Sequence, residues 1–247
     1  DSVTDLELAK AIAEAAGKLL LELRGAGLFS GKALGKAGDR VANAFIMEAL
    51  AENRPHDAVL SEEERDNPSR LQAERVWIVD PLDGTREYAE GRDDWAVHVG
   101  LAINGVAKIG AVALPASGVV MLSEPHDVKQ SPEKLRMLVS RSRPAKEALD
   151  VAEALGAELV PMGSAGAKAM AVLRGDADIY LHTGGQYEWD NCAPAAVALA
   201  AGLHASRVDG TDLVYNNADP YLPDLLICRK ELAPHVFQKL SACRPVE

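Results

Sequence analysis

Two stretches near the start of the chain carry apolar residues at every third or fourth position, which is the spacing of a helix with one buried face. The first predicts a helix over residues 3–23, with Thr4 and Glu7 forming a capping box at its start. The second predicts a helix over residues 39–51, with Asp39 available as its N-cap. The chain is therefore expected to open with two amphipathic helices.

After these helices the pattern changes to short apolar runs separated by turn residues, which is typical of strands. Strands are predicted over residues 58–60 and 76–79, and residues 95–122 divide into three more at Asn104-Gly105 and Pro115. Strands and helices then alternate, with strands over 135–140, 177–181 and 224–228 and helices over 145–155, 163–173 and 191–201. We expect a layered α/β (α+β) protein with at least two sheets between helices.

The segment over residues 123–134 is polar, contains two prolines and has no periodicity, so it is the best candidate for a boundary. We place an N-terminal half at residues 1–128 and a C-terminal half at residues 129–247. A length of 247 residues fits one large unit or two closely packed halves.

Charge and composition exclude several classes of protein. The 26 Lys and Arg residues against 37 Asp and Glu give a net charge of −11, which argues against nucleic acid as a partner. No apolar run reaches the roughly 18 to 20 residues that a membrane helix needs, so no membrane partner is expected. The three cysteines have no disulfide or zinc-site spacing, and no signal-peptide pattern opens the sequence. These features predict a cytoplasmic protein.

The most informative segment is VWIVDPLDGTREY, residues 76–88, in which an apolar strand ends at Asp80. Pro81 favours a turn that would bring the α-carbons of Asp80 and Asp83 within about 7 Å of each other. Carboxylates and exposed carbonyls are the ligands that Mg²⁺ prefers. The amides of Gly84 and Thr85, at the start of a short helix, would form a phosphate cradle beside them. The alternative is a plain turn in which Asp83 caps that helix.

Two further acidic segments follow apolar runs. SEEER over residues 61–65 comes directly after a predicted strand, and EWD over residues 188–190 precedes a predicted helix. Taken alone, SEEER is most simply a solvated charged face, and Asp190 is most simply a helix N-cap. If Glu62 and Asp190 converge with the Asp80 turn, however, they form a metal cluster with open positions for water and phosphate.

These segments carry a family resemblance. DPLDGT at 80–85, SEE at 61–63 and WD at 189–190 resemble, in order and spacing, the three signatures of the Mg²⁺-dependent, lithium-sensitive phosphatases that include inositol monophosphatase. Within that superfamily, nearly the whole chain resembles bacterial 3′(2′),5′-bisphosphate nucleotidases of the CysQ type. The resemblance implies a layered αβαβα sandwich of the sugar-phosphatase type.

The resemblance also implies roles for individual residues. Two or three Mg²⁺ ions would be held by Glu62, Asp80, the carbonyl of Leu82, Asp83 and Asp190, with Glu63 adjacent. Thr85 and Asp39, together with Glu62, would activate and orient the attacking water, without a covalent phosphoenzyme. The segment GKAGD, which ends at Asp39, departs from the VTxAD that is usual in the family.

The substrate wall is implied by blocks that line the nucleoside and its second phosphate in the nucleotidases. They correspond to Ser140, Arg141, Arg143, Gly163, Ser164 and Lys168. Gly84, Thr85 and Asp190 are the other residues expected to bind the substrate. Taken singly, each arginine is more simply a solvated loop residue. The chain has Arg143 where relatives carry a histidine, and His182 where relatives can carry arginine, so the preferred ligand stays open. His98 and Cys192 are expected to be structural.

The implied activity is hydrolysis of 3′-phosphoadenosine 5′-phosphate, and of its 5′-phosphosulfate form, in connection with sulfate assimilation. An inositol monophosphatase or a fructose-1,6-bisphosphatase is the alternative with the same metal chemistry. A regulator without catalysis is the alternative from another class. The partner is then a small-molecule phosphate ester, and homodimerisation, which is common among relatives, is left open.

Overall fold

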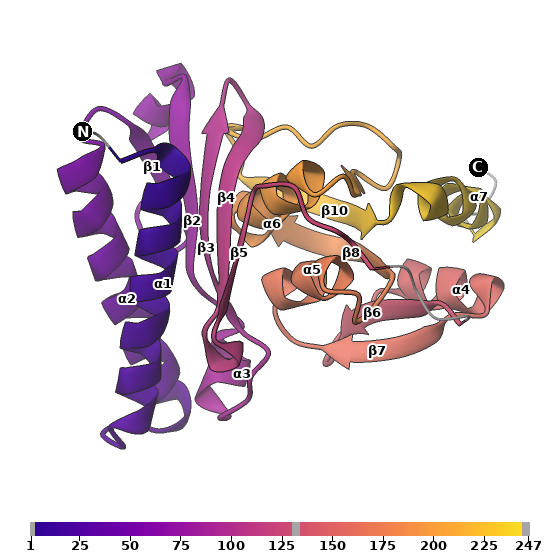
Figure 1. Ribbon diagram of the computed structural model, residues 1–247, viewed down its shortest axis with the longest axis horizontal. Helices are drawn as coiled ribbons and strands as arrows, with labels where there is room; N and C mark the ends of the chain where they lie inside the picture. Colours follow the sequence, from indigo (N-terminus) through magenta and orange to yellow (C-terminus); the bar gives the residue numbers. More distant parts are fainter. Residues whose placement is uncertain (1–2, 130–133, 244–247) are drawn as a thin grey trace.

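The computed structural model describes residues 3–129 and 134–243, so residues 130–133 of the expected boundary lie outside the described part. The elements form five layers: a helix pair, a sheet, a second helix pair, a second sheet and a third helix pair (Figure 1). This is the predicted αβαβα sandwich. Among the described residues, no helix is both long and apolar enough to cross a membrane.

The outermost layer consists of α1 (Asp5–Gly25) and α2 (Gly31–Asn53), which cover one face of the first sheet. Thr4 caps α1 as expected, since its side chain accepts a hydrogen bond from the backbone amide of Glu7. The apolar stripe of α1 is buried against α2 and the sheet, where it joins Trp77 and Val99 in one core. Burying this stripe is what stabilises the two helices.

The first sheet has the order β1-β2-β3-β4-β5 and uses only residues between 58 and 122. Its strands are β1 (Ala58–Ser61), β2 (Arg75–Asp83), β3 (Ala96–Ile103), β4 (Val106–Leu114) and β5 (Val119–Leu122). β1 runs parallel to β2, and the other pairs are antiparallel. The short helix α3 (Thr85–Ala89) follows β2 directly.

The second sheet has the order β7-β6-β8-β10-β9. Its strands are β6 (Arg136–Ser140), β7 (Glu158–Met162), β8 (Ile179–Tyr187), β9 (His204–Ser206) and β10 (Tyr221–Cys228). The helices α4 (Lys146–Leu155) and α7 (Ala233–Cys243) cover its outer face. Short 3₁₀ helices lie at Pro68–Gln72, Pro115–Ser117 and Lys230–Leu232. The boundary between halves at 128/129 stays a prediction.

The middle layer, α5 (Ala165–Leu173) and α6 (Glu188–Ala200), joins the two sheets. Although α6 follows the second sheet in sequence, it packs against β3 and β4 of the first. This packing is close: a Cβ on Gly110 would lie 2.5 Å from the carbonyl oxygen of Ala193, a distance that real Cβ atoms do not reach. Because Gly110 has no side chain, α6 from the C-terminal part of the chain can pack directly against β4 of the first sheet.

Two predicted helix starts are wrong. The helix expected over 39–51 begins at Gly31, so Asp39 lies inside α2 and is not its N-cap. Glycines disfavour a helix interior by about 1 kcal/mol each, but here Gly35 and Gly38 let α2 approach α3, because a Cβ on Gly35 would lie 2.9 Å from the Thr85 side chain. The helix expected over 191–201 begins at Glu188, so Asp190 lies in its first turn and is not its N-cap.

Candidate active site and metal centre

A bulge at the end of β2 brings Asp80 and Asp83 to one side of the sheet. Residues three apart on a regular strand point to opposite faces. Here Asp80 pairs with His98 and Asp83 with Ala96, so β2 spans three steps while β3 spans two. The extra residue rotates the later side chain to the same face. Both aspartates are buried, with 1% and 7% of their surface exposed.

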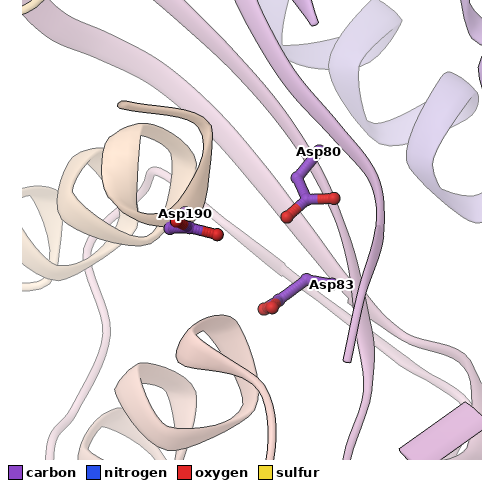
Figure 2. A group of neighbouring side chains, drawn as sticks. All are labelled: Asp80, Asp83 and Asp190. Carbon is purple, nitrogen blue, oxygen red and sulfur yellow. The ribbon is translucent and has the colours of Figure 1, made fainter. Parts of the chain in front are cut away.

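The third carboxylate comes from α6. Asp190 lies close to Asp80 and Asp83. One carboxylate oxygen from each of the three residues lies within 4.8 Å of the corresponding oxygens of the other two. Figure 2 shows the three side chains facing a common space between β2 and the start of α6. The backbone amide of Tyr187 donates a hydrogen bond of 2.8 Å to Asp190 Oδ2, which fixes that carboxylate at the start of the helix.

Glu62 is not among the three carboxylates that lie within 4.8 Å of one another, but it lies next to Asp80 at the side of this group. It follows β1, whose last residue, Ser61, donates a hydrogen bond of 2.8 Å to the side-chain oxygen of Asn43 on α2. Asn43 in turn donates to Glu64 at 2.9 Å, so this turn is held on both sides. Glu62 is exposed as a residue, yet its carboxylate lies close enough to Asp80 for the two to share a hydrogen bond.

The electrostatics of the cluster favour a bound cation. Burial, together with the neighbouring carboxylates, raises the pKa of Asp80 well above its usual range and the pKa of Asp190 to about 7. Packing around the carboxylate of Glu62 and the charges beside it raise its pKa to about 7. Several carboxylates that resist ionisation together are a donor set for a hard divalent cation. The residues present therefore fit a site for such ions.

Asp83 differs from its neighbours because it already has donors. Its Oδ2 accepts hydrogen bonds from the hydroxyl of Ser164 at 2.5 Å and from the amide of Gly166 at 2.8 Å. The ring of His98 lies on the same oxygen. Burial raises the pKa of Asp83, but the positive charge on His98 and these hydrogen bonds outweigh it, so the pKa is lowered overall. Asp83 is thus held ionised, with Oδ1 left for a ligand.

Thr85 and Asp39 form the expected pair. Thr85 Oγ lies 3.0 Å from Asp39 Oδ1 and 3.2 Å from the carbonyl oxygen of Leu82, and its single hydrogen can be donated to either. Partial burial, with the charge of Glu63, raises the pKa of Asp39 to about 6. A cleft of about 450 Å³, lined also by Lys32 and Lys36, opens onto this pair. GKAGD therefore places Asp39 beside Thr85 although it departs from the usual motif.

The predicted phosphate cradle begins at Gly84, directly after Asp83. Gly84 has a φ of 86°, a left-handed conformation that permits the sharp passage from β2 to α3. The amides at the start of α3 lack partners within the helix, as the first amides of any helix do. They lie directly beside Asp83, where a phosphate bridging the cluster would need donors.

The residues predicted for the substrate wall already have partners within the protein. Arg141 lies 2.9 Å from Glu90 and 3.6 Å from Glu87. The amide of Gly163 donates to Asp94 at 2.6 Å. Lys168 is buried and donates to the carbonyl of Met162 at 3.1 Å.

Of the remaining wall residues, Ser140 and Ser164 have partners through their side chains, whereas Arg143 is bonded through its backbone amide. Ser140 Oγ accepts from the amide of Arg143, whose side chain is exposed. Ser164, which we expected to meet a substrate anion, caps α5 by accepting from the amide of Ala167 and donates to Asp83. His182 Nε2 lies 2.9 Å from the carbonyl of Gly185.

Sequence reasoning missed two features of the site. One is an aromatic group at the start of α6: the Tyr187 ring stacks on Trp189 with centroids 4.9 Å apart, and Tyr221 meets its edge at 5.8 Å. The other is the contact of His98 with Asp83, because the pairing of β3 with β2 is a long-range feature. The signal available was a charged residue within an otherwise apolar strand.

The chain matches the model of the inositol monophosphatase family over residues 4–244. The chain belongs to the inositol monophosphatase family. A relative from Mycobacterium leprae named 3′-phosphoadenosine 5′-phosphate phosphatase is 51% identical over 94% of this chain and 92% of its own length. The 3′(2′),5′-bisphosphate nucleotidase CysQ of Escherichia coli is 30% identical over 75% of this chain and 81% of its own length.

Solved structures of the family share the fold. An inositol monophosphatase from Anabaena superposes with a TM-score of 0.74 at 23% identity, covering 98% of this chain and 96% of that one. Inositol monophosphatase II from Staphylococcus aureus superposes with a TM-score of 0.78 at 19% identity, covering 96% and 93%. At these identities the likeness establishes the family's layered fold.

Proposed function

We propose that the chain is an Mg²⁺-dependent phosphatase that hydrolyses the 3′-phosphate of 3′-phosphoadenosine 5′-phosphate to give AMP and phosphate. The observation that carries this is the group of buried Asp80 and Asp83 with half-buried Asp190, beside the Thr85–Asp39 pair. The name of the mycobacterial relative, which is 51% identical over most of both chains, supports the substrate. We extend the proposal to the 5′-phosphosulfate form, which carries the same 3′-phosphate.

The acidic cluster would hold the cations. Divalent ions there would neutralise the carboxylates, polarise the phosphate and make a water more acidic. Without them, the clustered negative charges would repel a phosphate dianion at short range. The role of Asp80, Asp83, Asp190, Glu62 and the Leu82 carbonyl is thus to make this position attractive for an anion.

Thr85 and Asp39 would orient the attacking water. When the Thr85 hydroxyl donates to Asp39, its oxygen is free to accept a hydrogen from a water on the other side. Asp39 lies on α2 and Asp190 on α6, and these helices cover opposite faces of the first sheet. In-line displacement needs the attacking water and the departing alkoxide on opposite sides of the phosphorus, so we assign the water to the Thr85–Asp39 pair and the alkoxide to the side of Asp190. Thr85 positions the water and does not attack.

The aromatic group favours a nucleotide over an inositol phosphate. Tyr187 and Tyr221 each expose 45% of their surface, and the backbone of Tyr187 is bonded to Asp190. Stacking of a base on an exposed ring contributes about 1 to 3 kcal/mol. An inositol ring has no aromatic face to match. We assign this surface to the adenine, with the leaving 3′-oxygen directed toward Asp190.

Phosphate release from a matched panel tests the proposal. The panel holds 3′-phosphoadenosine 5′-phosphate, its 5′-phosphosulfate form, inositol 1-phosphate and fructose 1,6-bisphosphate, each with Mg²⁺, with chelator and with Li⁺. We expect the bisphosphate nucleotide to have the highest kcat/KM, with activity lost in chelator and reduced by Li⁺. A higher kcat/KM for inositol 1-phosphate would replace the substrate, and no Mg²⁺-dependent release from any member would refute the activity.

A cytoplasmic location and the homodimer stay predictions. Sedimentation of the purified chain at micromolar concentration decides between a monomer and a dimer.

A further inference from the structure

One fully buried side chain connects the two parts of the chain that meet at the acidic cluster. His98 lies on β3, directly across from Asp80, and none of its surface is exposed. Its Nδ1 lies 2.9 Å from the carbonyl oxygen of Trp189 in the first turn of α6. Its Nε2 lies 2.9 Å from Asp83 Oδ2 at the end of β2. The ring therefore spans the gap between one carboxylate and the helix that carries another.

We propose that His98 is a positioning residue of the metal centre, which holds Asp83 and the first turn of α6 at a fixed separation. This rests on the proposed function, since it assumes that the cluster binds a divalent cation. His98 does not touch the phosphate in this proposal. It acts through Asp83 and through the helix turn that carries Asp190.

The two contacts of the ring have different character. A carbonyl oxygen can only accept, so the 2.9 Å contact with Trp189 requires a proton on Nδ1. Nε2 lies 2.9 Å from a carboxylate oxygen of Asp83, but at an angle outside that of a good hydrogen bond, so this edge of the ring is in close contact with Asp83 without a formed hydrogen bond. The contact with Trp189 thus sets the orientation of the ring, and the oriented ring presents its other edge to Asp83.

The surroundings show that the ring occupies a shaped site. Gly166, whose amide bonds the same oxygen of Asp83, has no room for a side chain, because a Cβ there would overlap His98 Nε2. The start of α5 is therefore built around the ring. Ser164 and Gly166 hold Asp83 Oδ2 from the α5 side, and His98 holds it from β3.

This arrangement has a consequence for cation binding. With three groups on Oδ2, Asp83 can present Oδ1 to a cation in one orientation only. Removing His98 would free the carboxylate on one side and would detach the carbonyl of Trp189, the residue before Asp190. Side chains that orient metal ligands in this way typically change metal affinity by about 10 to 100-fold when they are replaced.

Three substitutions separate the contacts. His98→Ala removes both. His98→Asn keeps an amide nitrogen near the position of Nδ1, which can still donate to Trp189, and His98→Gln keeps one near Nε2, which can still face Asp83. His235→Asn and His235→Gln, at an exposed position of α7, are the matched controls. Each metal-free protein is titrated with Mg²⁺ by calorimetry, and its melting temperature and its kcat and KM are measured alongside.

We expect the Mg²⁺ dissociation constant of His98→Ala to rise at least about tenfold, with smaller increases for His98→Asn and His98→Gln. The controls should match wild type, and kcat at fixed Mg²⁺ should fall more than KM rises. A folded His98→Ala with a dissociation constant within twofold of wild type would overturn the inference. If His98→Ala does not fold, the other two carry the test, and affinities within twofold of wild type for both would overturn it.

The titration of wild type distinguishes this inference from the function on which it rests. If wild type binds no Mg²⁺, the metal centre and the role of His98 fail together. If wild type binds Mg²⁺ and the His98 variants bind equally well, only the role of His98 fails.

Discussion

The two sides of the site differ in how their charges are matched. On the acidic side, Asp80, Asp190 and Glu62 crowd together, and burial and mutual repulsion raise the pKa of each. On the substrate wall, the Arg141 guanidinium already has carboxylate partners in Glu87 and Glu90. The acidic side thus needs cations to balance its charge, whereas Arg141 on the wall is already matched by glutamates.

This difference indicates an order of assembly. The acidic side presents carboxylates that repel one another and so favour a cation, whereas a phosphate on the wall must compete with glutamates for Arg141. We therefore expect the metals to bind first and to supply most of the attraction for the substrate. The wall would then select the substrate more by shape and stacking than by charge.

Replacing an acidic group should have the largest effect. Asp80→Asn removes a carboxylate from the centre of the cluster, so we expect kcat to fall on the order of a thousandfold. Because the repulsion with Glu62 and Asp190 is relieved, the melting temperature of the metal-free variant should rise. Phosphate release and thermal unfolding measure both.

Asp150→Asn, at an exposed ion pair on α4, is the control and should behave as wild type. Near-normal turnover of Asp80→Asn at moderate Mg²⁺ would show that the crowded carboxylates of the acidic side are not required for catalysis.

Thr85→Ala tests the other function of the acidic side, the orientation of water. Loss of the hydroxyl that contacts Asp39 should lower kcat by about a hundredfold while KM changes little. Thr85→Ser keeps the hydroxyl and should recover most of the rate. Single-turnover rates with melting curves provide the measurement, and a loss of stability that accounts for the lost activity would contradict the assignment.

The N-terminal part of the site was predictable because its information is local. In DPLDGT, a strand, a turn and a helix start lie within a few residues, so Asp80, Asp83 and Thr85 follow from their spacing. The layered fold followed similarly from apolar periodicity, and it is confirmed by the two sheets and by the family's solved structures.

The remaining features depend on packing between distant segments. The extension of α2 to Gly31 could not be predicted from the sequence pattern. Glycines disfavour a helix locally, and the close packing on α3 that they allow is a contact between distant segments. The pairing of Arg141 with Glu87 and Glu90 likewise depends on where β6 ends relative to α3. Neither contact can be inferred from the spacing of residues along the chain.

Tyr187→Ala tests whether the substrate is selected by stacking on the exposed aromatic surface. Loss of the exposed ring beside Asp190 should raise KM for the bisphosphate nucleotide about tenfold, the equivalent of one lost stacking contact. KM for inositol 1-phosphate should stay unchanged, and Tyr187→Phe should retain normal KM for both. An equal rise for both substrates would show that the ring supports the fold of the site and does not bind a base.

The smallest effect that we expect is a pH dependence of stability in the metal-free protein. In the folded protein the pKa of Glu62 and of Asp190 is raised to about 7, above ordinary values of 4.5 and 3.8. Between these values the folded state holds more protons than the unfolded chain, so the free energy of unfolding falls as pH rises. Without metal, the melting temperature at pH 8 should lie a few degrees below that at pH 5.5.

Saturating Mg²⁺ should remove this difference at the higher pH, because the cation replaces the protons as the partner of the carboxylates. A metal-free protein that becomes more stable as pH rises would contradict the raised pKa values, and with them the uncompensated charge on the acidic side.

The most direct test of the account is a crystal soaked with Mn²⁺ and measured for anomalous scattering, since this locates the cation without reference to activity. We expect a peak bounded by the carboxylates of Asp80, Asp83 and Asp190. An empty cluster in crystals that bind Mn²⁺ elsewhere would contradict it.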